Sequence, residues 1–88
     1  EGNKYLKEAV SDLNTAISLD GDDVGFRQLR SDYNKELGEP EDAIEDYDVM
    51  IKINPDKVEA YTERGLIEMQ NDQYKEAIDD FSKSILPK

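Results

Sequence analysis

The chain has 88 residues, of which 36% are hydrophobic, and its 22 acidic residues outnumber 11 basic ones to give a net charge of −11. This length fits one small domain with a thin core. The charge repels phosphate backbones and anionic lipid, so we expect no nucleic acid partner. No apolar run approaches the roughly 20 residues that span a bilayer, so we expect no membrane partner either.

Two residue types that carry much protein chemistry are missing. The sequence contains no cysteine and no histidine. This excludes disulfides, thiolate metal sites and cysteine nucleophiles, and it removes the commonest metal ligand and general base. There is also no glycine-rich phosphate loop. We therefore expect no enzyme, no cofactor and no metal. The compartment is not indicated, although we favour the cytoplasm.

Hydrophobic periodicity predicts two helices in the first half of the chain. The first runs from about Lys4 to Leu19, with Asn3 as its cap. The second is capped by Asp22 or Asp23 and ends at Gly38. Their expected apolar faces are Leu6, Val10, Leu13 and Ile17 in the first helix, and Phe26, Leu29, Tyr33 and Leu37 in the second.

Three further helices are predicted in the second half. One runs from about Pro40 to Ile53, one opens at a capping box of Asp56 and Glu59 and reaches Gln70, and one runs from about Gln73 to Leu86. Pro87 stops the last. Their expected apolar faces are Ala43, Ile44, Tyr47, Met50 and Ile51; then Val58, Tyr61 and Gly65; then Tyr74, Ala77, Ile78, Phe81 and Ile85. Short loops predict antiparallel neighbours.

The apolar positions recur at a fixed interval. Three sets are spaced 34 residues apart: Ala9, Ala43 and Ala77; Leu13, Tyr47 and Phe81; Ile17, Ile51 and Ile85. A fixed period in this range indicates stacked helical repeats, in which each hairpin buries its apolar face against the next.

The period, together with alanine and an aromatic residue four positions later in Ala43/Tyr47 and Ala77/Phe81, resembles the tetratricopeptide repeat (TPR) family. The resemblance implies an all-α, TPR-type α-solenoid of antiparallel helix hairpins with five helices, half a repeat plus two full repeats. We expect a single domain over residues 1–88, in which 1–21 is the second helix of a partial repeat and 22–55 and 56–88 are full repeats. We also expect the chain to be a piece of a longer protein.

The register of the middle repeat is open between two alignments. One turns Phe26, Leu29 and Tyr33 inward together, places Arg30 in the family's glycine position and adds one residue to the turn that follows. The other keeps strict 34-residue spacing and places Ser31 in the glycine position. We favour the first, because burying three large side chains stabilises by about 1.5–3 kcal/mol each.

The resemblance implies a protein-interaction module, an adaptor or scaffold, whose first helices line a concave groove that binds a peptide or protein segment. The expected groove residues are Arg27, Gln28, Ser31, Asn34, Glu59, Thr62, Glu63, Leu66, Met69 and Gln70. Leu66 and Met69 lie off the expected core face, so they either meet the ligand, pack inside the hairpin or are ordinary exposed residues.

Charge indicates which peptide to expect. Some TPR proteins clamp the acidic tails of Hsp70 and Hsp90 with basic groove residues. Here Glu59 and Glu63 occupy groove positions, so we expect a basic or mixed-charge partner. The alternative function is structural self-association, a homo-oligomer formed through the uncapped terminal helices.

Two acidic patterns have simpler interpretations. Asp20, Asp22 and Gly25 match positions of a calcium loop, but Ser31 replaces the bidentate glutamate, so a turn with a helix cap is favoured. The carboxylates of Glu41–Asp46 and Asp79–Asp80 are expected to face mostly solvent.

Overall fold

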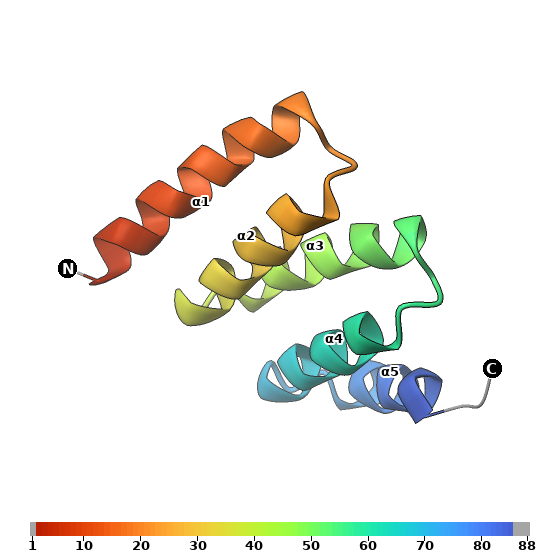
Figure 1. Ribbon diagram of the computed structural model, residues 1–88. Helices are drawn as coiled ribbons and strands as arrows, with labels where there is room; N and C mark the ends of the chain where they lie inside the picture. Colours follow the sequence, from red (N-terminus) through yellow and green to blue (C-terminus); the bar gives the residue numbers. More distant parts are fainter. Residues whose placement is uncertain (1, 86–88) are drawn as a thin grey trace.

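The computed structural model describes residues 2–85. These residues form five helices and no strand: α1 (Gly2–Leu19), α2 (Val24–Glu36), α3 (Pro40–Ile53), α4 (Val58–Gln70) and α5 (Tyr74–Ile85). Consecutive helices pack side by side in an elongated body of 39 × 27 × 13 Å (Figure 1). The all-α architecture of antiparallel hairpins is confirmed. The expected helix end at Leu86 and stop at Pro87 lie outside the described residues.

Most helix boundaries follow the expected signals. Asp23 caps α2, because its Oδ1 accepts a hydrogen bond from the Phe26 N–H at 3.1 Å. Pro40 opens α3 at its first turn. Two expected caps are wrong: Asn3 lies inside α1, and the residue that precedes α4 is Lys57, with no side-chain cap hydrogen bond.

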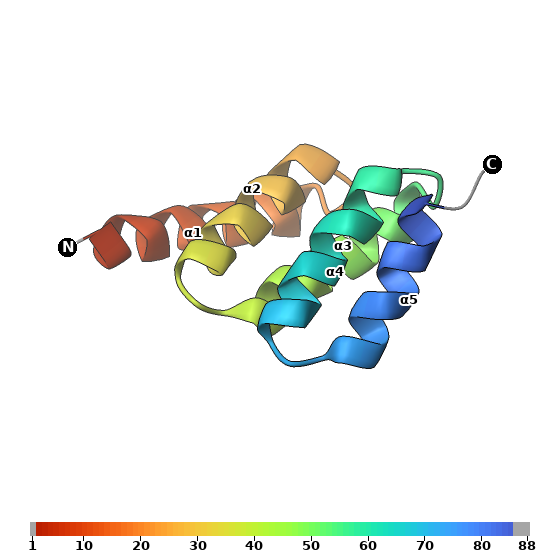
Figure 2. The same cartoon turned by 90° about the horizontal axis from the view of Figure 1, so that it is seen from below.

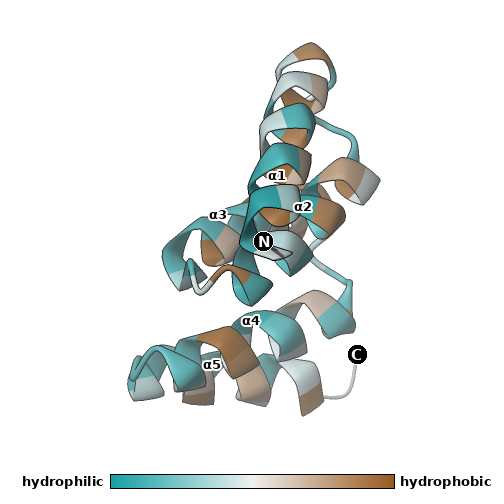
Figure 3. Ribbon diagram, turned by 90° about the vertical axis from the view of Figure 1, so that its left-hand side faces the viewer, coloured by the Kyte–Doolittle hydropathy of each residue, from teal (hydrophilic) through white to brown (hydrophobic). Residues whose placement is uncertain are grey.

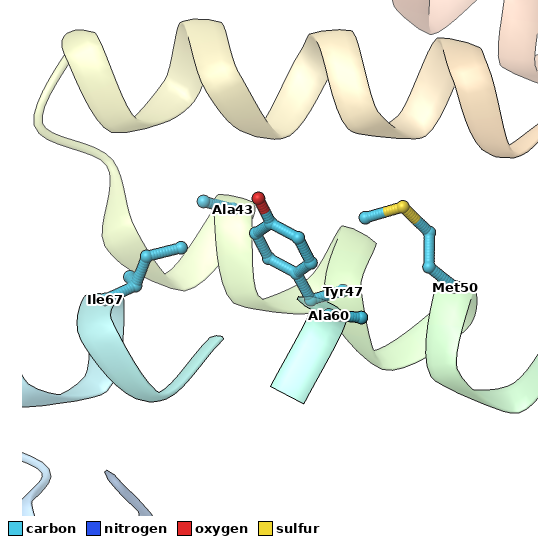
Figure 4. Packing of buried hydrophobic residues seen from close by; sticks show 5 residues of the cluster. All are labelled: Ala43, Tyr47, Met50, Ala60 and Ile67. Atoms are coloured by element: carbon cyan, nitrogen blue, oxygen red, sulfur yellow. The ribbon is translucent and has the colours of Figure 1, made fainter. Parts of the chain in front are cut away.

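The apolar core is centred on α3. Ala43, Tyr47 and Met50 of α3 and Ala60 and Ile67 of α4 are all buried and form one cluster (Figure 4). The side chains of α3 therefore hold the two full hairpins together, as the 34-residue pattern predicts. Because the core is this small, each polar contact around it matters to the stability of the fold.

The two full hairpins repeat each other at strict 34-residue spacing. Gly38 and Asp72 both take a positive φ, 74° and 63°, at the turn. The backbone N–H that follows each donates to an equivalent carbonyl: Glu39 to Asn34 at 2.9 Å and Gln73 to Glu68 at 2.7 Å. The favoured register with an extra turn residue is therefore wrong.

Burial within α2 also supports strict spacing. Ser31 is fully buried, while Leu29 is 45% exposed. At the equivalent position 65, a Cβ on the glycine would lie 2.7 Å from the Phe81 ring. Small residues at both positions let the two helices of each hairpin approach closely. The expected apolar face of α2 is wrong at Leu29, and the most buried residues of α2 are Ser31 and Asn34, which are small or polar.

The physical reason for this register is a buried ion pair within each hairpin. Arg30 donates from Nε to Asp46 Oδ2 at 2.8 Å and from Nη2 to Oδ1 at 2.5 Å. Arg64 donates to the two oxygens of Asp80 in the same way, at 2.7 and 2.6 Å. Both carboxylates are buried, whereas the other four carboxylates of Glu41–Asp46 and Asp79–Asp80 are exposed as expected. A buried carboxylate needs such a bidentate partner.

Each arginine also reaches the preceding hairpin. Arg30 Nη1 donates to Asn14 Oδ1 at 2.8 Å, and Arg64 Nη1 donates to Asp48 Oδ1 at 2.7 Å. We call Arg30, Arg64 and these acceptors, with Asp46 and Asp80, the arginine ladder. Hydrogen bonds to Asp46 and Asp80 raise the pKa of Arg30 and Arg64, so both guanidinium groups stay charged.

The last helix leaves apolar side chains uncovered. Tyr74, Ile78 and Ile85 were expected inward but are more than half exposed, because no described helix packs beyond α5. Hydrophobic and hydrophilic residues alternate along the ribbons of α4 and α5 (Figure 3). The buried side of α5 is provided by Ala77 and Asp80.

We predict that Arg64→Met lowers the free energy of unfolding by about 3 kcal/mol, because it leaves Asp80 buried without its cation. The double variant Arg64→Met/Asp80→Leu recovers most of this loss, since no lone charge remains. Urea denaturation measures both. Lys83→Met is the control, because it breaks an exposed pair with Asp79 worth about 0.5 kcal/mol or less. Equal losses in Arg64→Met and Lys83→Met would contradict the prediction.

Candidate functional site

The two first helices of the full hairpins, α2 and α4, lie on the same side of α3 (Figure 2). The groove residues predicted on α4 share one face and are at least partly exposed: Glu59, Thr62, Glu63, Leu66, Met69 and Gln70. Leu66 is 51% exposed and Met69 is 45% exposed, so neither packs inside the hairpin. They lie three residues apart on this face and so present their apolar side chains side by side.

Three of the four residues expected from α2 do not lie on this face. Ser31 is fully buried and Asn34 is only 5% exposed. Arg27 is tied to Asp46 at 3.1 Å and to the Gly21 carbonyl at 2.9 Å. Among the four expected α2 residues, only Gln28 is partly exposed on the same face as the α4 residues. Its side-chain amide donates hydrogen bonds to Asp32 Oδ1 at 3.1 Å and to the Tyr47 hydroxyl at 3.0 Å.

Strict 34-residue spacing finds the residues that the other register missed. Subtracting 34 from these six α4 positions gives Gly25, Gln28, Leu29, Asp32, Lys35 and Glu36, all at least partly exposed. We call these residues, with Glu59, Thr62, Glu63, Leu66, Met69 and Gln70, the inner face. The signal was present in the sequence, because the period itself assigns these positions.

A small hollow lies between the ends of α2 and α4. Its volume is about 250 Å³, and Lys35, Gly38, Pro40, Ile67 and Gln70 line it. Pro40 and Ile67 make its floor apolar, whereas Lys35 and Gln70 belong to the inner face. Such a hollow can accept one apolar side chain of a bound segment, next to Leu66 and Met69 along α4.

The inner face is strongly acidic. It carries four carboxylates, from Asp32, Glu36, Glu59 and Glu63, and one cation, Lys35. The Lys35 ammonium lies 3.4 Å from Asp32 Oδ1 and 5.9 Å from the centre of the Tyr47 ring. Burial opposes its charge, but Tyr47 and Asp32 outweigh burial and raise the pKa of Lys35. The field over this face therefore favours positive groups.

The last hairpin holds a carboxyl group that sequence reasoning did not single out. Glu68 takes the position of Asn34 and is only 5% exposed. Its Oε2 lies 3.9 Å from Arg64 Nε, and its Oε1 has no hydrogen-bond partner within residues 2–85. Burial, followed by the nearby Asp80 carboxylate, raises the pKa of Glu68 to about 8. Glu68 is therefore mostly protonated at neutral pH.

The described part of the chain offers neither a metal site nor a membrane-spanning helix. Among residues 2–85, no three acidic side chains gather closely enough to hold a metal ion. None of the helices over this range combines the length and the apolar character that crossing a membrane requires.

Stacked antiparallel hairpins with a fixed period define a helical-repeat protein of the solenoid class. Residues 58–86 match the tetratricopeptide repeat. Tetratricopeptide repeat protein 34 of Xenopus laevis is 31% identical, and that of Homo sapiens is 29% identical. Each alignment covers 97% of this chain but 15% of the relative, so the chain spans a small part of those proteins. Residues 58–86 therefore match one repeat of the tetratricopeptide repeat family, and the whole chain is similar to part of these tetratricopeptide repeat proteins. Members of that family are in general protein-interaction scaffolds rather than enzymes.

Solved structures agree with this assignment. MamA is 27% identical with a TM-score of 0.85, over 92% of this chain and 47% of MamA. The second TPR of Spaghetti (RPAP3), bound to the HSP90 peptide SRMEEVD, is 20% identical with a TM-score of 0.80. That match covers 94% of this chain and 77% of the other, and at this identity it concerns the fold alone.

We predict that Glu68→Gln removes a pH-dependent loss of stability. Because folding raises the pKa of Glu68 from 4.5 to about 8, its contribution is complete below pH 4.5 and is lost as pH rises to about 8. Urea denaturation between pH 4.5 and 9 should show similar stabilities at the acidic end. At the alkaline end the variant should be more stable by about 1–3 kcal/mol.

The control is Glu41→Gln, which removes one charge at an exposed position of α3. It reports the effect of net charge alone, which is small at surface sites. A difference between Glu68→Gln and the native chain that stays constant with pH would show that Glu68 does not titrate in this range.

Proposed function

We propose that the chain binds a peptide or protein segment along the inner face and does no chemistry. The observation that carries the proposal is the exposed pair Leu66 and Met69 on α4, the helix whose Ile67 and Gln70 line the hollow. Apolar anchors that enter small pockets supply most of the energy at protein interfaces. Similarity to tetratricopeptide repeat proteins supports a binding role, and the exposed apolar pair beside carboxylates supports the inner face as the place of binding.

The partner that fits best is basic or of mixed charge. The inner face carries four carboxylates and only one cation, Lys35, so it repels an acidic segment and attracts lysine and arginine side chains. The RPAP3 repeat binds an acidic HSP90 peptide, but the inner face of this chain is acidic itself. We infer that its ligand has an apolar residue for the hollow, with basic residues on either side.

The second candidate function is self-association. The exposed Tyr74, Ile78 and Ile85 on α5 favour it, because they occupy the 34-residue equivalents of Pro40, Ile44 and Ile51. Ile44 and Ile51 pack against the core cluster, so the same positions on α5 are suited to a further helix. Sedimentation across a concentration series tests this role. A monomer at all concentrations would reject it.

We predict that Leu66→Ser/Met69→Ser weakens binding of a basic, apolar-centred peptide by about 10-fold or more, because it removes both apolar anchors. NMR titration of the native chain should shift the backbone signals of Thr62, Leu66 and Met69. A peptide with its basic residues replaced by glutamate should bind more weakly.

The matched control is Leu19→Ser, which makes the same kind of change at an exposed leucine of α1 that is not part of the inner face. Its affinity should stay within about twofold of the native chain. Tighter binding of the acidic peptide, or equal losses in Leu19→Ser, would overturn the proposal.

A further inference from the structure

A second hollow lies between α1 and α3, over α2. Its volume is about 200 Å³. It is continuous with a shallower one of about 410 Å³, since Val10, Asn34 and Asp42 line both. We call the two together the outer hollow. Its lining comprises Val10, Asn14, Arg30, Asn34, Asp42 and Glu45, with Asn3, Lys7, Leu37 and Glu39 in the shallower part.

The outer hollow faces away from the inner face. At 100° per residue, Arg30 and Asn34 point about 200° and 240° from Gln28 around the α2 axis. Asp32 and Lys35 point within about 40° of Gln28. Asn34, expected in the groove, therefore lies on the opposite side of α2. A ligand in the outer hollow would not compete with a segment on the inner face.

The lining of the outer hollow includes an amide that the fold leaves available. Asn34 is only 5% exposed, lines both parts of the hollow and makes no side-chain hydrogen bond within residues 2–85. Its backbone carbonyl, by contrast, accepts from the Glu39 N–H at 2.9 Å. An amide carries both acceptor and donor atoms, so the Asn34 side chain can bond a polar group that enters the outer hollow.

The charge around the outer hollow is negative. The Arg30 guanidinium is held by both oxygens of the buried Asp46, so its charge is largely offset. The remaining charged groups are three carboxylates, from Glu39, Asp42 and Glu45, and one ammonium, from Lys7. This balance favours a cationic ligand group.

We propose that the outer hollow receives a lysine or arginine side chain from a partner protein. The aliphatic stem packs on Val10 and Leu37, as long basic side chains do on apolar surface. The charged end lies between Asp42 and Glu45 and donates a hydrogen bond to Asn34 Oδ1.

The last hairpin provides an internal comparison. The 34-residue equivalents of Asn34, Asp42 and Glu45 are Glu68, Glu76 and Asp79. There the longer Glu68 side chain replaces the asparagine, and Asp79 is paired with Lys83 at 3.1 Å. The last hairpin therefore has two exposed carboxylates at the positions equivalent to Asp42 and Glu45, but Glu68 in place of Asn34. This makes Glu76 and Asp79 a matched control for the proposed site.

The test is an NMR titration of the whole chain with Ac-Gly-Arg-Gly-NH2, its lysine analogue and its citrulline analogue. The arginine and lysine peptides should shift the side-chain amide signals of Asn34 and Asn14. Citrulline keeps the shape but lacks the charge, so it should bind at least about fivefold more weakly.

Two double variants complete the test. Asp42→Asn/Glu45→Gln should weaken the arginine peptide about fivefold or more at Asn34, because both exposed carboxylates are lost. Glu76→Gln/Asp79→Asn makes the same charge change and should stay within about twofold. Thermal melts should show that both variants are folded, since all four carboxylates are exposed.

Three results would overturn the proposal: unchanged Asn34 signals, equal binding of the citrulline peptide, or equal weakening by both double variants. Shifts at Thr62 and Leu66 without shifts at Asn34 would support the inner face alone and would also reject the outer site. Shifts at Asn34 without those at Leu66 would support the outer site independently of the proposed groove.

Discussion

The fold depends on how each hairpin buries a carboxylate. Asp46 and Asp80 lie at the contact between the two helices of their hairpins, where an unpaired charge would be strongly destabilising. The bidentate arginines, Arg30 and Arg64, remove that penalty and fix how the helices face each other. Since the apolar core is small, this polar contact decides which residues of α2 and α4 point inward and which are left for binding.

Much of the fold could be predicted from the sequence, because the signals for it are local. Alanines and large apolar residues at a 34-residue period predict the hairpins, and proline, glycine and aspartate predict most of the helix ends. The register of α2 could not be obtained in this way. Phe26, Leu29 and Tyr33 follow helical periodicity, but the positions that are buried belong to Ser31 and Asn34. The register is decided by the ion pair between Arg30 and Asp46, which lie sixteen residues apart. The spacing of apolar residues does not report such a contact.

The residues of the candidate site were likewise predicted well on α4 and poorly on α2. On α4 the expected exposed residues agree with the structure, because Gly65 anchors the register there. On α2 the wrong register placed residues of the opposite helix face in the groove. Asn34 was therefore assigned to the groove, while Asp32, Lys35 and Glu36 were missed. The acidic character of the inner face became stronger after this correction, and that strengthens the inference of a basic partner.

The arginine ladder also has a consequence for how the molecule unfolds. Arg30 joins α1 to the middle hairpin, and Arg64 joins α3 to the last hairpin, so each arginine belongs to two neighbouring units. In linear repeat arrays, coupling between nearest neighbours determines whether units melt singly or as one block. When one unit frays, the arginine of the next unit loses a hydrogen-bond acceptor, and that unit becomes less stable as well. The ladder therefore couples the unfolding of neighbouring units, so the chain unfolds more cooperatively than independent hairpins would.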